Sequence, residues 1–229
     1  MEKSRKTSPS FGGVKGGTKW SILTAAILWF VMFSPWTAPH LNFWGAMTAS
    51  ACVLTGLALI GLKKQNEQLF GEPGSHGDTL RFMFSTLLWG VCIAVALWWI
   101  FWIGDKVSAW MFGFAREQVN GIYAMKEGTP SWVIALLLLF LIGPAEEIFW
   151  RGYIQRNLSR LWSPNMGFLV TLLLYTAIHI PSGNFMLIMA ALTCGFFWGL
   201  LYRLWPNRLP AIILSHALWD AAAFVWFPI

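Results

Sequence analysis

Long stretches without a charged side chain dominate the chain. Apart from Asp220, no Asp, Glu, Lys or Arg occurs at residues 20–62, 82–104, 128–145, 161–202 and 209–229. A transmembrane helix needs about 20 predominantly apolar residues, so the two longest stretches can each hold two spans. A transmembrane β-barrel would need alternating apolar and polar residues, which the sequence lacks. The pattern therefore predicts an all-α fold, a polytopic transmembrane helical bundle.

Seven spans fit this pattern. We expect them at residues 20–34, 41–62, 80–103, from residue 131 onward, 166–180, 184–202 and 209–227. Pro35 and Pro39 make the first span short, because proline does not continue a helix. Residues 105–129 mix charged residues with aromatic ones such as Trp110 and Phe112. They are expected to form an amphipathic helix that lies at the membrane interface.

Composition agrees with a membrane protein, and the loop charges predict its orientation. Of the 229 residues, 57% are hydrophobic and 11% are charged, against about 25% charged in soluble domains. With a cytoplasmic N-terminus, only Lys106, Arg116 and Lys126 of the 16 basic residues lie outside, which is the positive-inside pattern. Topology thus explains the net charge of +6. We predict a multi-pass protein of the cell membrane, with the lipid bilayer and no nucleic acid as partner.

The chain divides into a tail and one domain. Residues 1–19, rich in Gly, Ser and Lys, are expected to be disordered, and residues 20–229 to form a single transmembrane domain. Cys52, Cys92 and Cys194 fall in separate spans without metal-type spacing. We expect them to be buried thiols.

A few ionisable residues at membrane depth carry the candidate chemistry. They are Glu146, Glu147 and Arg151 on the fourth helix, His179 on the fifth, and His216 and Asp220 on the seventh. Glu147 and Arg151 are four residues apart and can pair on one helix face. Glu146 lies about 100° round the helix and cannot share that arginine. One carboxylate is then left free to act as a general base.

Hairpin geometry predicts which of these side chains meet. If the fourth helix turns at residues 162–165, where Pro164 breaks it, residue 146 lies opposite residue 179. Glu146 and His179 should then face each other at one depth. His216 and Asp220, four apart, share a face of the seventh helix. We expect all three helices to converge just below the cytoplasmic surface.

These residues also resemble the motifs of a known family. EEIFWRG, containing Glu146, Glu147 and Arg151, resembles the EExxxR motif of the CAAX protease and bacteriocin-processing family of intramembrane proteases. YTAIH, ending in His179, and HALWD, from His216 to Asp220, are similar to its FxxxH and HxxxN or HxxxD motifs. The resemblance covers a protease-like core at about residues 131–229. The family is similar in fold to the Ras-converting CAAX endoprotease, an all-helical bundle with its site in the membrane.

The resemblance implies a role for each residue. Glu146 and His179 would activate a water for peptide hydrolysis, and Glu147 with Arg151 would organise the site. His216 with Asp220 would stabilise the oxyanion. The implied activity is that of an intramembrane endopeptidase that cleaves a membrane-associated protein or peptide. A prenylated CAAX substrate implies a eukaryotic setting, whereas this short chain with its positive-inside pattern looks more like a bacterial or archaeal protein.

Two positions depart from the family pattern. Tyr175 stands where phenylalanine is usual, and its hydroxyl needs a partner when buried. Asp220 stands where asparagine is common, and an ionised aspartate would repel an oxyanion. Asp220 is therefore protonated, orients His216, or helps to bind a metal. The apolar end of the seventh span favours the first of these three roles.

A metal and other functions stay open at this stage. Glu146, His179 and His216 could hold Zn²⁺ with a water as fourth ligand, although a metal-independent mechanism is favoured because no HExxH helix is present. The site residues could instead be a packing ion pair and hydrogen-bonded core histidines, but ionisable groups at this depth usually mark function. A non-catalytic immunity or scaffold protein of the same fold is the main alternative. A proton-coupled transporter is less favoured, since repeated halves are lacking.

Overall fold

The computed structural model describes residues 15–70 and 76–229. All regular secondary structure in these two ranges is helical, which confirms the all-α prediction. Helices long and apolar enough to cross a membrane occur at Gly16–Phe33, Phe43–Lys64, Thr79–Met111, Ser131–Leu161, Pro164–Ser182, Phe185–Leu204 and Pro206–Trp226. The seven predicted spans are thus confirmed, and the third is longer than expected. Residues 1–14 of the predicted tail lie outside the described ranges, whereas residues 16–19 begin the first helix.

The spans are assembled from elements of different helix type. The first three spans and the following short helix are α1 (Gly16–Phe33), η2 (Ala38–His40), α2 (Phe43–Lys64), α3 (His76–Met111) and α4 (Ala115–Ala124). The fourth span comprises α5 (Ser131–Leu137), η3 (Leu138–Ile142), α6 (Gly143–Glu147), η4 (Ile148–Gln155) and α7 (Arg156–Leu161). The last three spans comprise α8 (Pro164–Ala177), η5 (Ile180–Ser182), α9 (Phe185–Leu204), η6 (Pro206–Arg208), α10 (Leu209–Ala221) and η7 (Ala222–Trp226).

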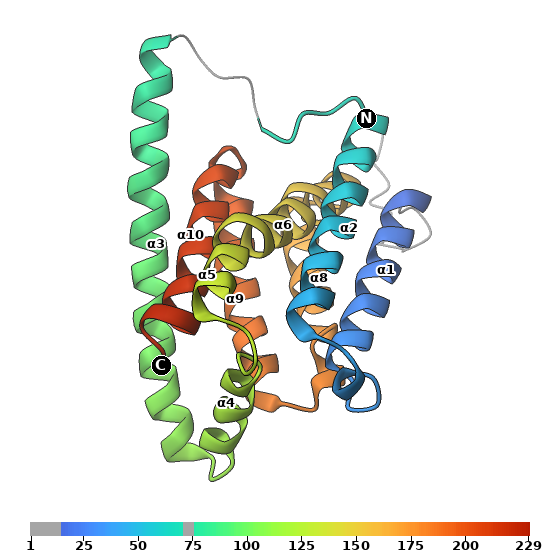
Figure 1. Ribbon diagram of the computed structural model, residues 1–229. Coiled ribbons are helices and arrows are strands. Elements are labelled where there is room, and N and C mark those ends of the chain that lie inside the picture. The colour runs from blue at the N-terminus through green and yellow to red at the C-terminus, as the bar shows by residue number, and fades with distance from the viewer. Residues whose placement is uncertain (1–14, 71–75) are drawn as a thin grey trace, which may run out of the picture.

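The fourth span crosses the middle of the bundle (Figure 1). Its segments pack against α10 on one side and α2 on the other, while α3 lines the outer face of α10. Helices α8 and α9 form an antiparallel pair, as do α1 and α2. The candidate residues of the fourth and seventh spans are therefore brought together at the centre.

Two π-helical segments, η3 and η4, flank the glutamates of the fourth span. The N–H of Gly143 donates to the carbonyl of Leu138, five residues back, and Pro144 follows directly. Proline has no N–H and would clash with the carbonyl four residues back in a regular α-helix, so a wider turn before it relieves the conflict.

Close helix contact at Gly143 sets the distance between α6 and α10. A Cβ atom on Gly143 would lie 2.9 Å from the Cα of Ala217. Only glycine therefore allows the two backbones to approach this closely. The consequence is that Glu147, four residues after Gly143, reaches His216, the residue directly before Ala217.

Polar side chains cap the helices that lead to the site. Asn42 accepts a hydrogen bond from the N–H of Gly45 at the start of α2, 2.7 Å long. Ser163 and Asn184 do the same at the starts of α8 and α9. Such caps satisfy N–H groups that a helix leaves unpaired. Ser163, inside the predicted turn at residues 162–165, is therefore the N-cap of the helix that begins at Pro164.

The surface differs from the expectations at two points. Residues 105–129 do not form one helix, because residues 105–111 end α3 and a ten-residue helix, α4, follows. The carboxylate of Asp105 and the guanidinium of Arg116, 2.7 Å apart, join the two helices. Cys194 is buried, but Cys52 and Cys92 are exposed on the apolar outer face, so the prediction of buried thiols is wrong for these two.

Candidate active site

Glu147 and Arg151 form a buried ion pair at the centre of the bundle. Nη1 of Arg151 donates to Oε1 of Glu147 over 2.7 Å, and both side chains are almost completely buried. The guanidinium also lies 4.9 Å from the ring centroid of Tyr175, within cation–π range. This is the pairing that the four-residue spacing predicts, even though Arg151 lies in a π-helical segment.

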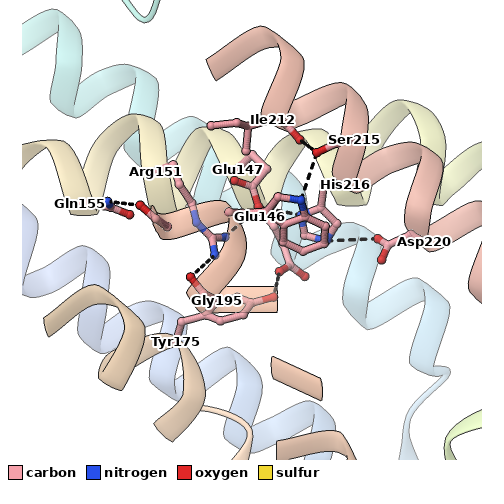
Figure 2. A network of polar contacts seen from close by, with 12 residues as sticks. Glu146, Glu147, Arg151, Gln155, Tyr175, Gly195, Ile212, Ser215, His216 and Asp220 are labelled. Atoms are coloured by element: carbon pink, nitrogen blue, oxygen red, sulfur yellow. Dashed lines mark hydrogen bonds and ion pairs between the residues drawn. The ribbon is translucent and has the colours of Figure 1, made fainter. Parts of the chain in front are cut away.

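His216 lies between two carboxylates. Its Nδ1 is 2.7 Å from Oε1 of Glu147, and its Nε2 is 3.4 Å from Oδ2 of Asp220 (Figure 2). When both carboxylates are ionised they only accept hydrogen bonds, and both ring nitrogens then donate, which is the pattern of the imidazolium ion. Glu147 thus joins the fourth and seventh spans through Arg151 and His216. The position of Asp220 fits a role in orienting the ring, and the protonated role that the apolar span end favours stays a prediction.

Trp198 of α9 fixes the plane of the His216 ring. The two rings stack with centroids 3.7 Å apart and planes inclined by 18°. Nε1 of Trp198 donates to Oγ of Ser215 over 3.0 Å, and that hydroxyl donates to the carbonyl of Ile212 over 2.7 Å. Since Ser215 precedes His216, one chain of contacts holds the indole, the hydroxyl and the imidazole together.

Glu146 has a different environment from Glu147. It is buried, and its Oε2 accepts a hydrogen bond of 2.8 Å from the hydroxyl of Tyr175. Among the described residues no ion pair joins Glu146 to a cation, because Arg151 and His216 both bind Glu147. The sequence identifies no partner for the hydroxyl of Tyr175. In the structure this buried hydroxyl binds Glu146, the glutamate that has no cationic partner among the described residues.

His179 is held in one tautomer by two hydrogen bonds. Its Nδ1 lies 2.8 Å from the carbonyl of Tyr175, and its Nε2 lies 3.3 Å from Nε1 of Trp29 in α1. A carbonyl only accepts and an indole N–H only donates, so Nδ1 carries the proton and Nε2 does not. His179 is therefore a neutral imidazole whose unprotonated nitrogen faces α1.

Glu146 and His179 are linked through Tyr175. Within residues 15–70 and 76–229 no direct hydrogen bond joins the two side chains, but Tyr175 binds one through its hydroxyl and the other through its carbonyl. Whether one water can bridge Glu146 and His179 stays a prediction. The equal depth expected from the hairpin is consistent with their shared contact.

A small cavity lies beside Glu146. It has a volume of about 10 Å³, close to the least space that one water needs. Its lining comes from three spans and consists of Trp29, Met47, Ala51, Leu54, Ile142, Ala145 and Glu146. Glu146 is the only ionisable group among these residues, so a water here would have the free carboxylate as its polar neighbour.

The residues considered for Zn²⁺ do not fit a shared metal ion. Both ring nitrogens of His179 bind Trp29 and Tyr175, and both of His216 face Glu147 and Asp220. In the part of the chain that the structure describes, no three His, Cys, Asp or Glu side chains are grouped to hold a metal. We therefore derive no catalytic step through a metal.

The sequence did not single out Trp29, Trp198 and Ser215 as site residues. All three are buried. Trp29 binds His179, while Trp198 stacks on His216 and binds Ser215. Trp and Phe occur throughout the spans, so an aromatic residue carries no distinctive signal there. Ser215, adjacent to His216, is the one that a search around the motif could have found.

A comparison with known families finds a match in the second half of the chain. Residues 128–222 match the family described as Type II CAAX prenyl endopeptidase Rce1-like. The matched stretch contains all six candidate residues and excludes α1, α2 and α3. No curated protein and no solved structure is significantly similar to the chain. The match confirms the resemblance that the motifs indicate and suggests intramembrane protease activity.

Proposed function

We propose that this chain, whose residues 128–222 match the Rce1-like endopeptidase family, hydrolyses a peptide bond within the membrane. The substrate is a membrane-associated protein or peptide, because the bundle has seven apolar spans. One observation carries the proposal. Glu146 is a buried carboxylate without a cationic partner among the described residues, and it borders a cavity of about one water's volume.

Glu146 acts as the general base in this proposal. It takes a proton from a water as the water oxygen attacks the carbonyl carbon, and the carbonyl oxygen becomes an oxyanion. The proton then passes to the leaving amine nitrogen as the carbon–nitrogen bond breaks. The hydrogen bond from Tyr175 holds the carboxylate in a fixed orientation for both transfers.

His179 orients the attacking water. Its unprotonated Nε2 can accept a hydrogen bond, and the present donor, Trp29, is 3.3 Å away, which is long for a protein hydrogen bond. A water bound to Glu146 can compete for this nitrogen. The bond from Nδ1 to Tyr175 keeps the tautomer that this role needs.

His216 stabilises the developing oxyanion. It binds Glu147 at 2.7 Å and Asp220 at 3.4 Å, so the second contact is the weaker one. An oxyanion that approaches Nε2 can therefore share this N–H with Asp220, while Glu147 and Arg151 keep the ring in place. Preorganised donors of this kind act strongly where water is excluded.

Replacement of Glu146 tests the proposal. Glu146→Gln keeps the volume and removes the base, so cleavage should fall by about 100-fold or more, the range of general-base catalysis. The measurement is mass spectrometry of new protein termini in membranes that contain the wild type or the variant. Glu117→Gln in the exposed part of α4 is the matched control and should leave the termini unchanged.

The proposal would be contradicted if membranes that contain folded Glu146→Gln protein gave the same new protein termini as wild-type membranes. If the wild type itself generates no termini, while the protein still alters the membrane's protein complexes, the non-catalytic scaffold function is supported instead. Size-exclusion profiles and thermal melting of both variants in detergent show whether the fold is kept.

A further inference from the structure

A second, much larger cavity lies where several spans end. Its volume is about 1130 Å³, larger than typical small-molecule sites of about 300–1000 Å³. The walls come from residues 67–70 after α2, the start of α3, the α7–α8 turn, and the α9–α10 connection. The loop charges predict that this end of the bundle faces the cytoplasm.

The cavity wall carries more positive than negative charge. Arg156, Arg160 and Arg203 line it, and Glu67 is the one carboxylate among its described lining residues. Glu67 pairs with Arg160 and lies 3.8 Å from Arg156. The cavity wall therefore carries three guanidinium groups and one carboxylate among the described residues.

The remaining partners of these arginines are uncharged. Arg156 donates to the carbonyls of Gln68 and Leu69 over 2.8 and 2.9 Å and to the hydroxyl of Tyr202 over 3.2 Å. Nε of Arg203 donates to the side-chain oxygen of Asn165. These bonds orient the side chains without cancelling their charge. The cavity is thus built to receive an anion.

Another part of the cavity wall is apolar and belongs partly to α3. Phe70 and Phe82 line the cavity, and both side chains are partly exposed. From Phe82 the same side of α3 continues to Trp89, seven residues and about two turns further on, and this side chain is also partly exposed. Figure 1 shows this part of α3 at the edge of the bundle. An occupant with a charged head and an apolar tail matches both walls.

We propose that this cavity binds the headgroup of an anionic phospholipid, with the phosphate at Arg160 and Arg203 and an acyl chain along α3. Basic pockets between spans on the cytoplasmic side are a recognised way to hold such headgroups. Free phosphate offers the same charge but leaves the apolar wall without a partner. The inference stands independently of the proteolytic function.

Lipid retention by the full-length protein tests this site. The protein is purified in mild detergent, incubated with equal amounts of phosphatidylglycerol and phosphatidylcholine, and examined by native mass spectrometry. The wild type should retain phosphatidylglycerol in preference. Arg160→Gln/Arg203→Gln should weaken that retention roughly 30-fold, because each basic residue near an anionic headgroup contributes about a fivefold preference.

Two double variants control for charge and for packing. Lys64→Gln/Arg81→Gln removes two charges from the same predicted face, outside the cavity lining, and should retain lipid as the wild type does. Arg160→Lys/Arg203→Lys keeps the charges and should retain most of the binding. Size-exclusion chromatography of each variant verifies the fold.

Four results would overturn the site. The first two are equal retention of both lipids by the wild type, and retention of phosphatidylglycerol by Arg160→Gln/Arg203→Gln at the wild-type level. The third is a loss of retention in Lys64→Gln/Arg81→Gln as large as that in Arg160→Gln/Arg203→Gln. The fourth is a complete loss of retention in Arg160→Lys/Arg203→Lys. Displacement of the lipid by millimolar inorganic phosphate would assign the cavity to small anions and overturn the lipid assignment.

Discussion

At the scale of single residues, the site separates two adjacent glutamates by their partners. Glu147 receives Arg151 and His216, whereas Glu146 receives the hydroxyl of Tyr175 alone. The spacing in the sequence predicts the first pair, because side chains four residues apart share a helix face. It does not predict the contact with His216, since spacing within one helix contains no information about lateral packing between spans.

The role of Asp220 is the first prediction at this scale. Its carboxylate lies 3.4 Å from Nε2 of His216, so we expect it to orient the ring. Asp220→Asn should then lower the cleavage rate by roughly 100-fold or more, as when a catalytic triad loses its aspartate. The rate is measured across pH, with and without a chelator, on a substrate whose cleavage depends on Glu146.

Other outcomes for Asp220 point to other roles. A variant that stays active, with a pH range extended upward because an amide does not titrate, would show that Asp220 acts as a protonated donor. Partial rescue of the variant by added Zn²⁺ would identify a metal ligand. Either result would contradict the orienting role.

Trp198 provides the second residue-scale prediction. Trp198→Phe keeps an aromatic ring against His216 and loses the bond to Ser215, so its rate should fall only a few-fold, in line with one net hydrogen bond of about 1 kcal/mol. Trp198→Ala removes the stack and leaves a cavity that costs about 3–5 kcal/mol of stability. The pH dependence of kcat should also change in Trp198→Ala, because the ring of His216 is no longer held in one orientation.

The pH profile distinguishes positioning from stability in this test. A loss that comes only from less folded protein lowers kcat at all pH values and leaves the profile unchanged. Trp99→Ala on the exposed face of α3 is the control. It should match the wild type in kcat and in the pH profile of kcat. An unaltered profile in Trp198→Ala would refute the positioning role.

At the scale of elements, hydropathy predicts the number of spans but not their internal geometry. Apolar length determines whether a helix can cross the bilayer, so the seven spans follow from the sequence. The π-helical segments around Glu146 and Glu147 depend on Pro144 and on close contact with α10. Tertiary contacts of this kind have no periodic signature in one sequence.

Gly143 carries the prediction for elements. A Cβ there would meet the backbone of Ala217, so Gly143→Ala should push α6 away from α10 and cost about 1–3 kcal/mol, the usual range for overpacking. Activity should fall with it, because Glu147 and His216 then separate. Unfolding by added denaturing detergent and the cleavage rate measure the two effects.

Gly56→Ala in α2 is the matched control. No atom lies within 4 Å of a Cβ at Gly56, and alanine favours a helix over glycine by up to about 1 kcal/mol. This variant should be as stable as the wild type or slightly more so. Equal stability and activity in Gly143→Ala would show that the two backbones can separate without harm to the site.

At the scale of the whole molecule, the site extends beyond the matched family segment. Residues 128–222 contain the six candidate residues, but Trp29 of α1 binds His179, and α1 and α2 line the cavity beside Glu146. The motifs therefore predict the chemistry, whereas the side from which a substrate or water approaches depends on spans outside the match. Sequence alone could not join Trp29 to His179, because 150 residues separate them.

Orientation in the membrane is the last prediction, and it determines which leaflet the large basic cavity meets. The positive-inside pattern predicts that the α7–α8 turn is cytoplasmic and the α4–α5 connection is outside. In a chain with Cys52, Cys92 and Cys194 replaced, a membrane-impermeant maleimide should label Glu127→Cys in intact cells. Asn165→Cys should react only after permeabilisation. The reverse labelling would invert the topology, and the arginines of the cavity would then lie on the outer side, away from the anionic cytoplasmic leaflet.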